Sequence, residues 1–94
     1  LHLEPSPVTR LHRAIALRYR CGPVSAMAEL DLLASELDRY HLYHATRADL
    51  LRDLGDPAAA RTADRRALEL TANPAEQAVL QERIDCAARE ELRQ

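Results

Sequence analysis

The chain of 94 residues predicts an all-α fold of antiparallel helix-turn-helix repeats with about five helices, and three observations support this prediction. Alanine and leucine are its two most frequent residues, Phe and Trp are absent, and only two glycines occur, a composition typical of long helices joined by short turns. Each glycine is followed, at once or one residue later, by a proline that can open the next helix. Residues 41–74 form one unit with the spacing of a helical repeat.

The first helix is expected to begin at Pro7 behind Ser6 as N-cap, and to end at Gly22 and Pro23. Its apolar residues recur at helical spacing: Val8, Leu11, Ile15 and Tyr19. The second helix is expected over residues 24–37 and should pair back on the first through one apolar side. That side consists of Met27, Leu30, Leu33 or Ala34, and Leu37.

The third helix is expected over residues 39–54, with Gly55 as its stop signal. Asp56 then caps a fourth helix that has Pro57 at its first position and ends near Ala72.

A third cap-plus-proline start, Asn73 and Pro74 with Glu76, opens a fifth helix. This helix is expected to close the stack through its apolar residues, Val79, Leu80, Ile84, Ala87, Ala88 and Leu92. The domain organisation predicted is an N-terminal tail over residues 1–5, followed by residues 6–94 as two helical pairs and a closing helix.

The unit 41–74 has the anchor spacing of a tetratricopeptide repeat. The anchors are Ala48, Leu51, Gly55, Ala60 and Ala67. Small residues at three of these positions let two antiparallel helices approach closely, and we expect the three alanines to face one another. Asp64 stands where the repeat usually has an aromatic residue, so the seam of this unit is expected to be open there. Because the interval between Gly22 and Gly55 is close to one repeat length, the first helical pair is interpreted as a loose copy of the second.

The charge balance argues against general attraction to nucleic acid or to anionic lipid, because 13 basic and 15 acidic residues leave a formal net charge of −2. No apolar run reaches the roughly 20 residues that a membrane span needs, so a cytoplasmic protein is expected. Cys21 and Cys86 are predicted to be reduced packing thiols, because they lack metal or redox spacing. Since the chain begins at Leu1, we expect it to be part of a longer protein.

No catalytic or cofactor site is predicted. His41 and His44 share a helix face but lack a third metal ligand at useful spacing, which favours His41 at the helix rim and His44 in the seam. Cys21 and His12 would lie about 14 Å apart on a straight helix, too far for a nucleophile and its base. With two glycines in the chain, a glycine-rich phosphate loop is excluded. We therefore expect that the chain is not an enzyme and needs no cofactor or metal.

One charge pattern stands out on the first helix. Between Pro5 and Ala28 the sequence has four arginines and no acidic residue: Arg10, Arg13, Arg18 and Arg20. Arg13 and Arg20 align at 100° per residue, and Arg10 lies about 60° away. Arg10, Arg13 and Arg20 are candidate protein-interaction residues, whereas the alternative is a solvated stripe paired with acids of the second and third helices. Contact with phosphates would lack stacking partners, because the tyrosines are expected in the seams: Tyr19, Tyr40 and Tyr43.

The runs SPVTRLHRAIAL, YHLYHATRADLLRDLG and RRALELTANPAE, in this order and with the turn CGP, resemble the tetratricopeptide-like C-terminal extension of extracytoplasmic-function sigma factors of bacterial RNA polymerase. The resemblance covers about residues 5 to 85. It implies upstream domains that bind core polymerase and read the promoter, and an extension that docks on the sigma core and regulates transcription. Periodicity alone supports the alternative of a generic tetratricopeptide adaptor that binds a partner peptide.

Overall fold

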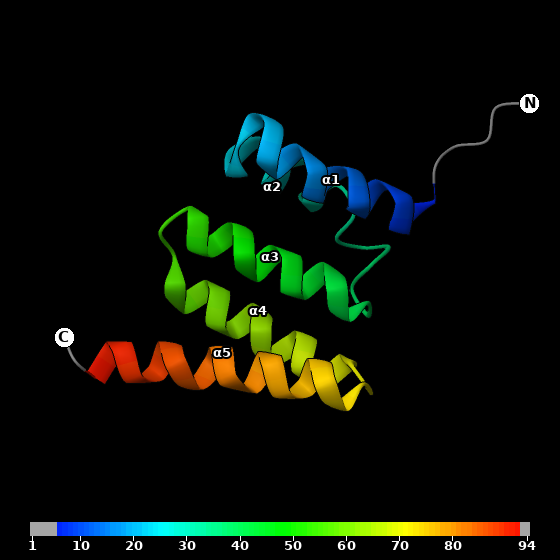
Figure 1. Cartoon of the computed structure of the whole chain (residues 1–94). Helices are drawn as coiled ribbons and strands as arrows, with labels where there is room; N and C mark the ends of the chain where they lie inside the picture. Colours follow the sequence, from blue (N-terminus) through cyan, green and yellow to red (C-terminus); the bar gives the residue numbers. More distant parts are fainter. Residues whose placement is uncertain (1–5, 93–94) are drawn as a thin grey trace, which may run out of the picture.

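The computed structural model describes residues 6–92, apart from the side chains of residues 87, 88 and 90–92. It confirms the all-α prediction: five helices are stacked in chain order, with α1 and α2 at one end and α5 at the other (Figure 1), and no strand occurs among the described residues. The helices are α1 (Pro7–Cys21), α2 (Pro23–Asp31), α3 (His41–Asp53), α4 (Pro57–Leu70) and α5 (Pro74–Leu92). The tail predicted for residues 1–5 and the predicted apolar side chains of Ala87, Ala88 and Leu92 lie outside the described residues.

Side-chain oxygens cap three helices where the sequence predicted a cap followed by proline. Ser6 Oγ accepts a hydrogen bond from the Thr9 backbone N–H at 3.2 Å, and Asp56 Oδ1 accepts one from Ala59 at 3.1 Å. Asn73 Oδ1 accepts from the N–H groups of Ala75 and Glu76 at 2.9 and 3.3 Å. Each cap satisfies a helical N–H group that has no partner inside its own helix.

Gly55 ends α3 in a Schellman motif. The Asp56 N–H donates to the Leu51 carbonyl at 2.9 Å and the Gly55 N–H donates to the Arg52 carbonyl at 3.1 Å. This turn needs a positive φ, and Gly55 has φ 83°. Gly22, with φ 91°, is the single residue between α1 and α2, so the first pair turns even more sharply than the second.

The second helix is shorter than predicted, because it ends at Asp31 instead of residue 37. The chain leaves the α-helix through tighter bonds: the Leu33 N–H donates to the Leu30 carbonyl at 2.9 Å, three residues back. Leu33 and Leu37 remain buried as predicted, because these turns fold them back into the core. Tertiary packing therefore ends the helix where the apolar period alone would have continued it.

Two clusters form the core. The larger one joins α1, α2, the following turns and α3 through Leu11, Ala26, Leu30, Leu33, Leu37, Tyr43 and Leu50. The smaller one lies between α3 and α4, which share the largest helix–helix interface, and contains Ala48, Ala60, Ala63 and the partly buried Leu51. Ala67 of α4 is also fully buried but is not a member of this cluster, which contains Ala63 of the same helix instead.

Asp64 does not open the seam. Its side chain is 0% exposed, and its carboxylate is paired with Arg52 of α3 and Arg83 of α5. An aspartate with two arginine partners therefore fills a place where the repeat pattern has an aromatic ring. The prediction of an open seam was wrong because it considered the size of Asp64 without the partners that the neighbouring helices supply.

Several side chains predicted to pack in seams are exposed. Tyr19 is 78% exposed, with the Arg18 guanidinium 5.5 Å from the centre of its ring, and Val79 is 56% exposed. Cys21 and Cys86 are free thiols on the surface, so their predicted packing role is wrong. Within the described part of the chain, no helix has the length and apolar character that crossing a membrane requires.

Candidate functional site: an arginine-lined groove on the first helical pair

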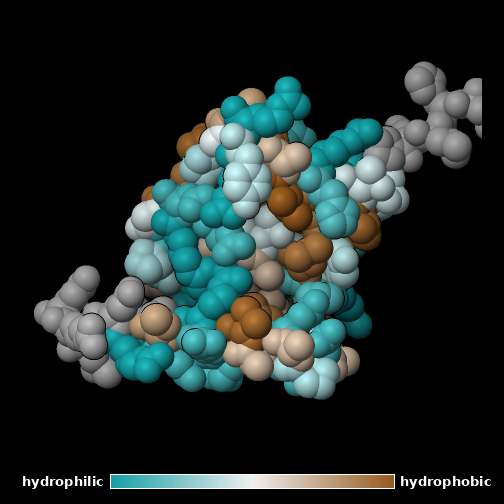
Figure 2. Space-filling model, in the orientation of Figure 1, coloured by the Kyte–Doolittle hydropathy of each residue, from teal (hydrophilic) through white to brown (hydrophobic). Residues whose placement is uncertain are grey.

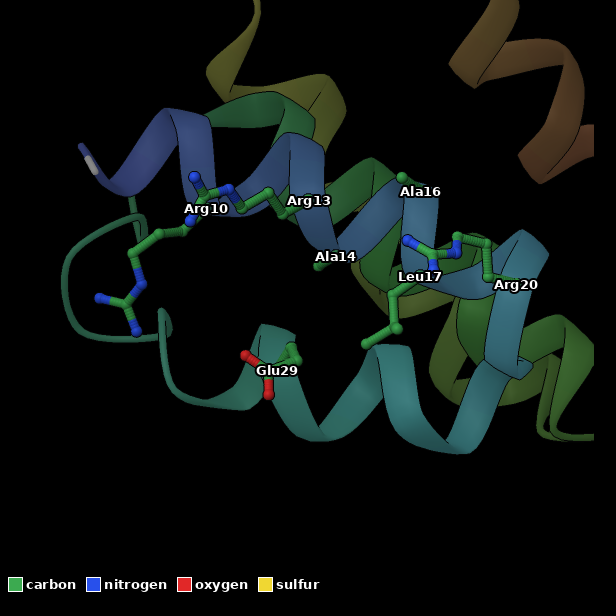
Figure 3. Close-up of a pocket in the computed structure, with 7 residues that line it drawn as sticks. All are labelled: Arg10, Arg13, Ala14, Ala16, Leu17, Arg20 and Glu29. Carbon is green, nitrogen blue, oxygen red and sulfur yellow. The ribbon is translucent and has the colours of Figure 1, made fainter. Parts of the chain in front are cut away.

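The three arginines predicted as interaction residues lie in one groove. The groove, of about 440 Å³, runs between α1 and α2, with Arg10, Arg13 and Arg20 along α1 (Figure 3). α2 contributes Glu29, and α1 supplies a floor of small and apolar residues, namely Ala14, Ala16 and Leu17. Figure 3 shows α3 and α4 behind this helical pair, so the groove opens on the end of the stack.

Helical spacing explains why these residues share a face. Arg13, Leu17 and Arg20 stand at positions i, i+4 and i+7, which lie above one another along a helix. In Figure 3 the side chains of Arg13 and Arg20 both lean toward the N-terminal end of α1, as helical side chains do. Leu17 points toward α2 between them. The result is a stripe with an apolar centre and a positive charge on each side of it.

The groove keeps most of its positive charge. Arg10 is paired with Glu36, in the turn after α2, but at 3.8 Å and with both side chains exposed by more than a third, so this pair contributes little. No ion pair joins Arg13 or Arg20 to a carboxylate among the side chains that the structure describes. Glu29 is the one acidic residue of the lining. An anionic partner would therefore find two arginine side chains that have no other ion-pair partner in this part of the chain.

Arg18 belongs to another face of α1. Its Nε donates to Asp53 Oδ2 at 2.6 Å and its Nη2 donates to Oδ1 at 3.1 Å, a bidentate pair that joins α1 to α3. The hydrogen bond to Arg18 lowers the pKa of Asp53, and the same bond raises the pKa of Arg18. The four arginines thus divide. Arg18 and Arg10 follow the predicted alternative, because Arg18 pairs with an acid of the third helix and Arg10 pairs with Glu36 of the segment predicted as the second helix, whereas Arg13 and Arg20 do not.

A second groove, which the sequence analysis missed, lies between α3 and α5. It has a volume of about 300 Å³ and a mostly apolar lining that includes Leu42, Ala45, Val79 and Leu80. His41 of α3 and Glu76 of α5 form an ion pair at 2.9 Å in its lining, provided that the imidazole is protonated. In Figure 2, one of the separate apolar areas of the surface lies over α5. Val79 stands at an apolar position of the helix that was predicted to close the stack. Its exposure in the structure marks the position of this groove.

The two histidines occupy the predicted places. His41 is half-buried at the rim, while His44 is buried, with its Nε2 2.6 Å from the Asp38 carbonyl oxygen and its ring edge-on to Tyr43. His44 therefore fastens the turn before α3 to the core. Among the described residues, no group of three or more His, Cys, Asp and Glu side chains is arranged to hold a metal ion.

An ion-pair network that the sequence analysis also missed connects α3, α4 and α5. Asp64 of α4 is paired with Arg52 and Arg83, and both arginines also reach Asp49 of α3, Arg83 at 2.6 Å and Arg52 at 3.5 Å. Asp49 in addition lies 4.0 Å from Arg18 of α1. These contacts fix the packing of the second helical pair and of α5, and they leave the arginines of the α1–α2 groove untouched.

A comparison with known proteins finds a relative whose own function is not described. The chain is 42% identical over 88 residues to an uncharacterized protein of Rhizobium meliloti (strain 1021). The alignment covers 94% of this chain but 21% of the relative, so the chain spans about a fifth of the length of the protein that it matches. No family model matches the chain, and no solved structure does.

Proposed function

We propose that this chain is a regulatory protein-interaction domain of a bacterial sigma factor, which docks on the sigma core or on RNA polymerase and modulates transcription initiation. The observation that supports it is the α1–α2 groove, which gathers Arg10, Arg13 and Arg20 at the α1–α2 end of the helical stack. The resemblance of the sequence to the tetratricopeptide-like extension of extracytoplasmic-function sigma factors supplies the identity of the partner.

In this proposal the domain is a cytoplasmic, non-enzymatic module. Its partners are the sigma core domains of its own parent chain and the polymerase core, and promoter DNA is reached only through the parent protein. The charge of −2 supports contact with protein in preference to nucleic acid. Docking would be electrostatic in part, and would weaken as salt rises because screening acts over about 8 Å at physiological ionic strength.

The test combines a deletion with a binding assay. We expect a parent protein that lacks residues 1–94 to show altered promoter-specific transcription, and we expect this chain to capture the upstream sigma domains in a pull-down. Charge reversal of Arg10 and Arg13 to glutamate should weaken the capture and leave the domain folded, because exposed helix charges contribute little to stability. Unchanged transcription after the deletion, together with no capture, would refute the proposal.

The α3–α5 groove favours a second candidate function, an adaptor that holds a partner peptide. Its apolar lining could accept one or two apolar side chains of an extended or helical segment, with His41 and Glu76 beside them. Discrimination is direct, because a substitution in one groove leaves the other unaltered. Binding of a partner peptide that is lost on changes at Val79, and not on changes at the arginines, would favour the adaptor.

A further inference from the structure

The side chains of α1 that line the groove are spaced like the side chains along one face of a partner α-helix. Arg13 and Arg20 are separated by two helical turns, about 10.5 Å at 1.5 Å per residue, and Leu17 lies between them. A partner α-helix lying along α1 has the same rise, so carboxylates seven residues apart on it would meet both arginines together. An apolar residue midway between them would cover Leu17.

From this geometry we infer that the α1–α2 groove receives an acidic amphipathic helix of a protein partner, with two carboxylates seven residues apart on either side of an apolar residue. This inference rests on the proposed function for the protein that carries the helix, and it deepens that function by naming what the groove recognises. Arg13 and Arg20 hold the two carboxylates, Leu17 packs on the apolar residue, and the small side chains of Ala14 and Ala16 leave space for the partner backbone.

The lining favours a helix over a nucleic acid. Glu29 can accept a hydrogen bond from a polar side chain of a peptide, whereas a phosphate backbone has no donor to offer it. Leu17 gives a phosphate nothing to contact, and Tyr19, the exposed aromatic residue of α1, is not part of the groove lining, so no ring is available there for base stacking. The separation of the two arginines also determines which spacing of acids on the partner helix can bind. Acids five residues apart point about 140° away from each other on a helix, so they cannot meet both arginines together.

The probes are two capped, alanine-rich helical peptides of identical composition. One places its glutamates seven residues apart with leucine midway, and the other places them five residues apart. Binding to this chain is measured by fluorescence anisotropy at low and physiological salt, beside a DNA duplex of random sequence. We expect the first peptide to bind about tenfold or more tightly than the second, and to lose that advantage as salt rises.

The variant is Arg13→Glu with Arg20→Glu, and the matched control is Arg65→Glu, an exposed arginine of α4 outside the groove. The double variant should lose roughly tenfold or more in affinity for the first peptide, since two attractions become repulsions, and the control should bind like the parent. Unchanged circular dichroism of the double variant would show that the loss is not unfolding. Exchanging the glutamates of the peptide for arginines should restore binding to the double variant.

Equal binding of the two peptides, or no binding of either, would overturn the inference, and so would tighter binding of the DNA duplex. The proposed function fails separately. If the upstream sigma domains dock on this chain and the double variant docks equally well, the helix inference is wrong while the regulatory function stands. If the peptide binds as expected and deletion of the domain leaves transcription unchanged, the groove chemistry holds and the sigma assignment is wrong.

Discussion

Asp64 Oδ1 of α4 lies 3.2 Å from Arg83 Nη2 of α5, and the same carboxylate is hydrogen bonded to Arg52 of α3 through its other oxygen. The acid is fully buried, whereas both arginines keep about a third of their side chains exposed. This difference in burial determines how much stability is lost when each arginine is removed. Removing one arginine leaves the carboxylate with the other, while removing both leaves a buried charge without compensation.

We therefore predict a non-additive loss of stability in this triad. Arg52→Ala and Arg83→Ala should each cost about 1 kcal/mol, and the double variant about 3 kcal/mol, near the low end for a stranded buried charge because water can enter. Adding Asp64→Leu to the double variant should recover part of the loss, since no buried charge then remains. Urea unfolding measures all four variants, with Arg65→Ala as the control; losses that simply add, with no recovery, would contradict this account.

The Arg18–Asp53 pair gives a prediction on pH. The hydrogen bond from Arg18 lowers the pKa of Asp53 below its ordinary value near 4. A group with a depressed folded pKa adds stability that is present above the ordinary pKa and is lost as pH falls through the folded value. The stability of the protein should therefore fall more steeply on acidification below about pH 4 than the stability of an Arg18→Gln variant.

Carboxylate NMR titration checks the cause of that difference. The pKa of Asp53 should rise toward its ordinary value in Arg18→Gln, because the hydrogen bond that lowers it is removed. It should stay low in Arg13→Gln, a matched arginine of the same helix that has no ion pair with Asp53. An Asp53 pKa that is the same in all three proteins would show that the pair does not persist in solution.

The sequence predicted those parts of the fold that depend on neighbours in the chain. Caps at Ser6, Asp56 and Asn73 are local chemistry, since each side chain reaches an N–H group two or three residues ahead. The stop at Gly55 is local as well, because a positive φ favours glycine. The starts of α1, α4 and α5 and the end of α3 follow from these signals.

What the sequence did not predict depends on contacts between distant elements. The second helix ends early because tight turns bring Leu33 and Leu37 into the core. Apolar periodicity alone cannot predict whether such packing or a longer helix is more favourable. Asp64 is buried because an arginine of the preceding helix and an arginine of the following helix both pair with it. The residue type at position 64 alone therefore led to the wrong prediction of an open seam. At the candidate site, the three groove arginines were found because they share one helix, whereas the α3–α5 groove needed two helices to be placed.

The seam between α3 and α4 gives a packing prediction. Ala60 is 0% exposed and packs with Ala48 and Ala63, so no space exists there for a larger side chain. Ala60→Leu should overpack the seam and cost roughly 1–3 kcal/mol. Ala58→Leu places the same side chain on the exposed side of the same helix, and its urea midpoint should match that of the parent. Equal midpoints for both variants would refute the repeat register.

Variants in the two grooves are expected to have opposite outcomes when the parent protein is tested in a promoter-specific transcription assay, depending on which groove binds the partner. Arg13→Glu with Arg20→Glu reverses the charge at the α1–α2 groove, and Val79→Glu places a carboxylate in the apolar α3–α5 groove beside Glu76. Both changes fall on exposed positions, so the free energy of unfolding should change by only about 0.5 kcal/mol in each. If regulation works through the arginine groove, the double variant should reproduce the effect of deleting residues 1–94 while Val79→Glu behaves like the parent. The reverse result would assign the partner to the α3–α5 groove, because only a partner seated on apolar side chains is repelled by a new carboxylate there.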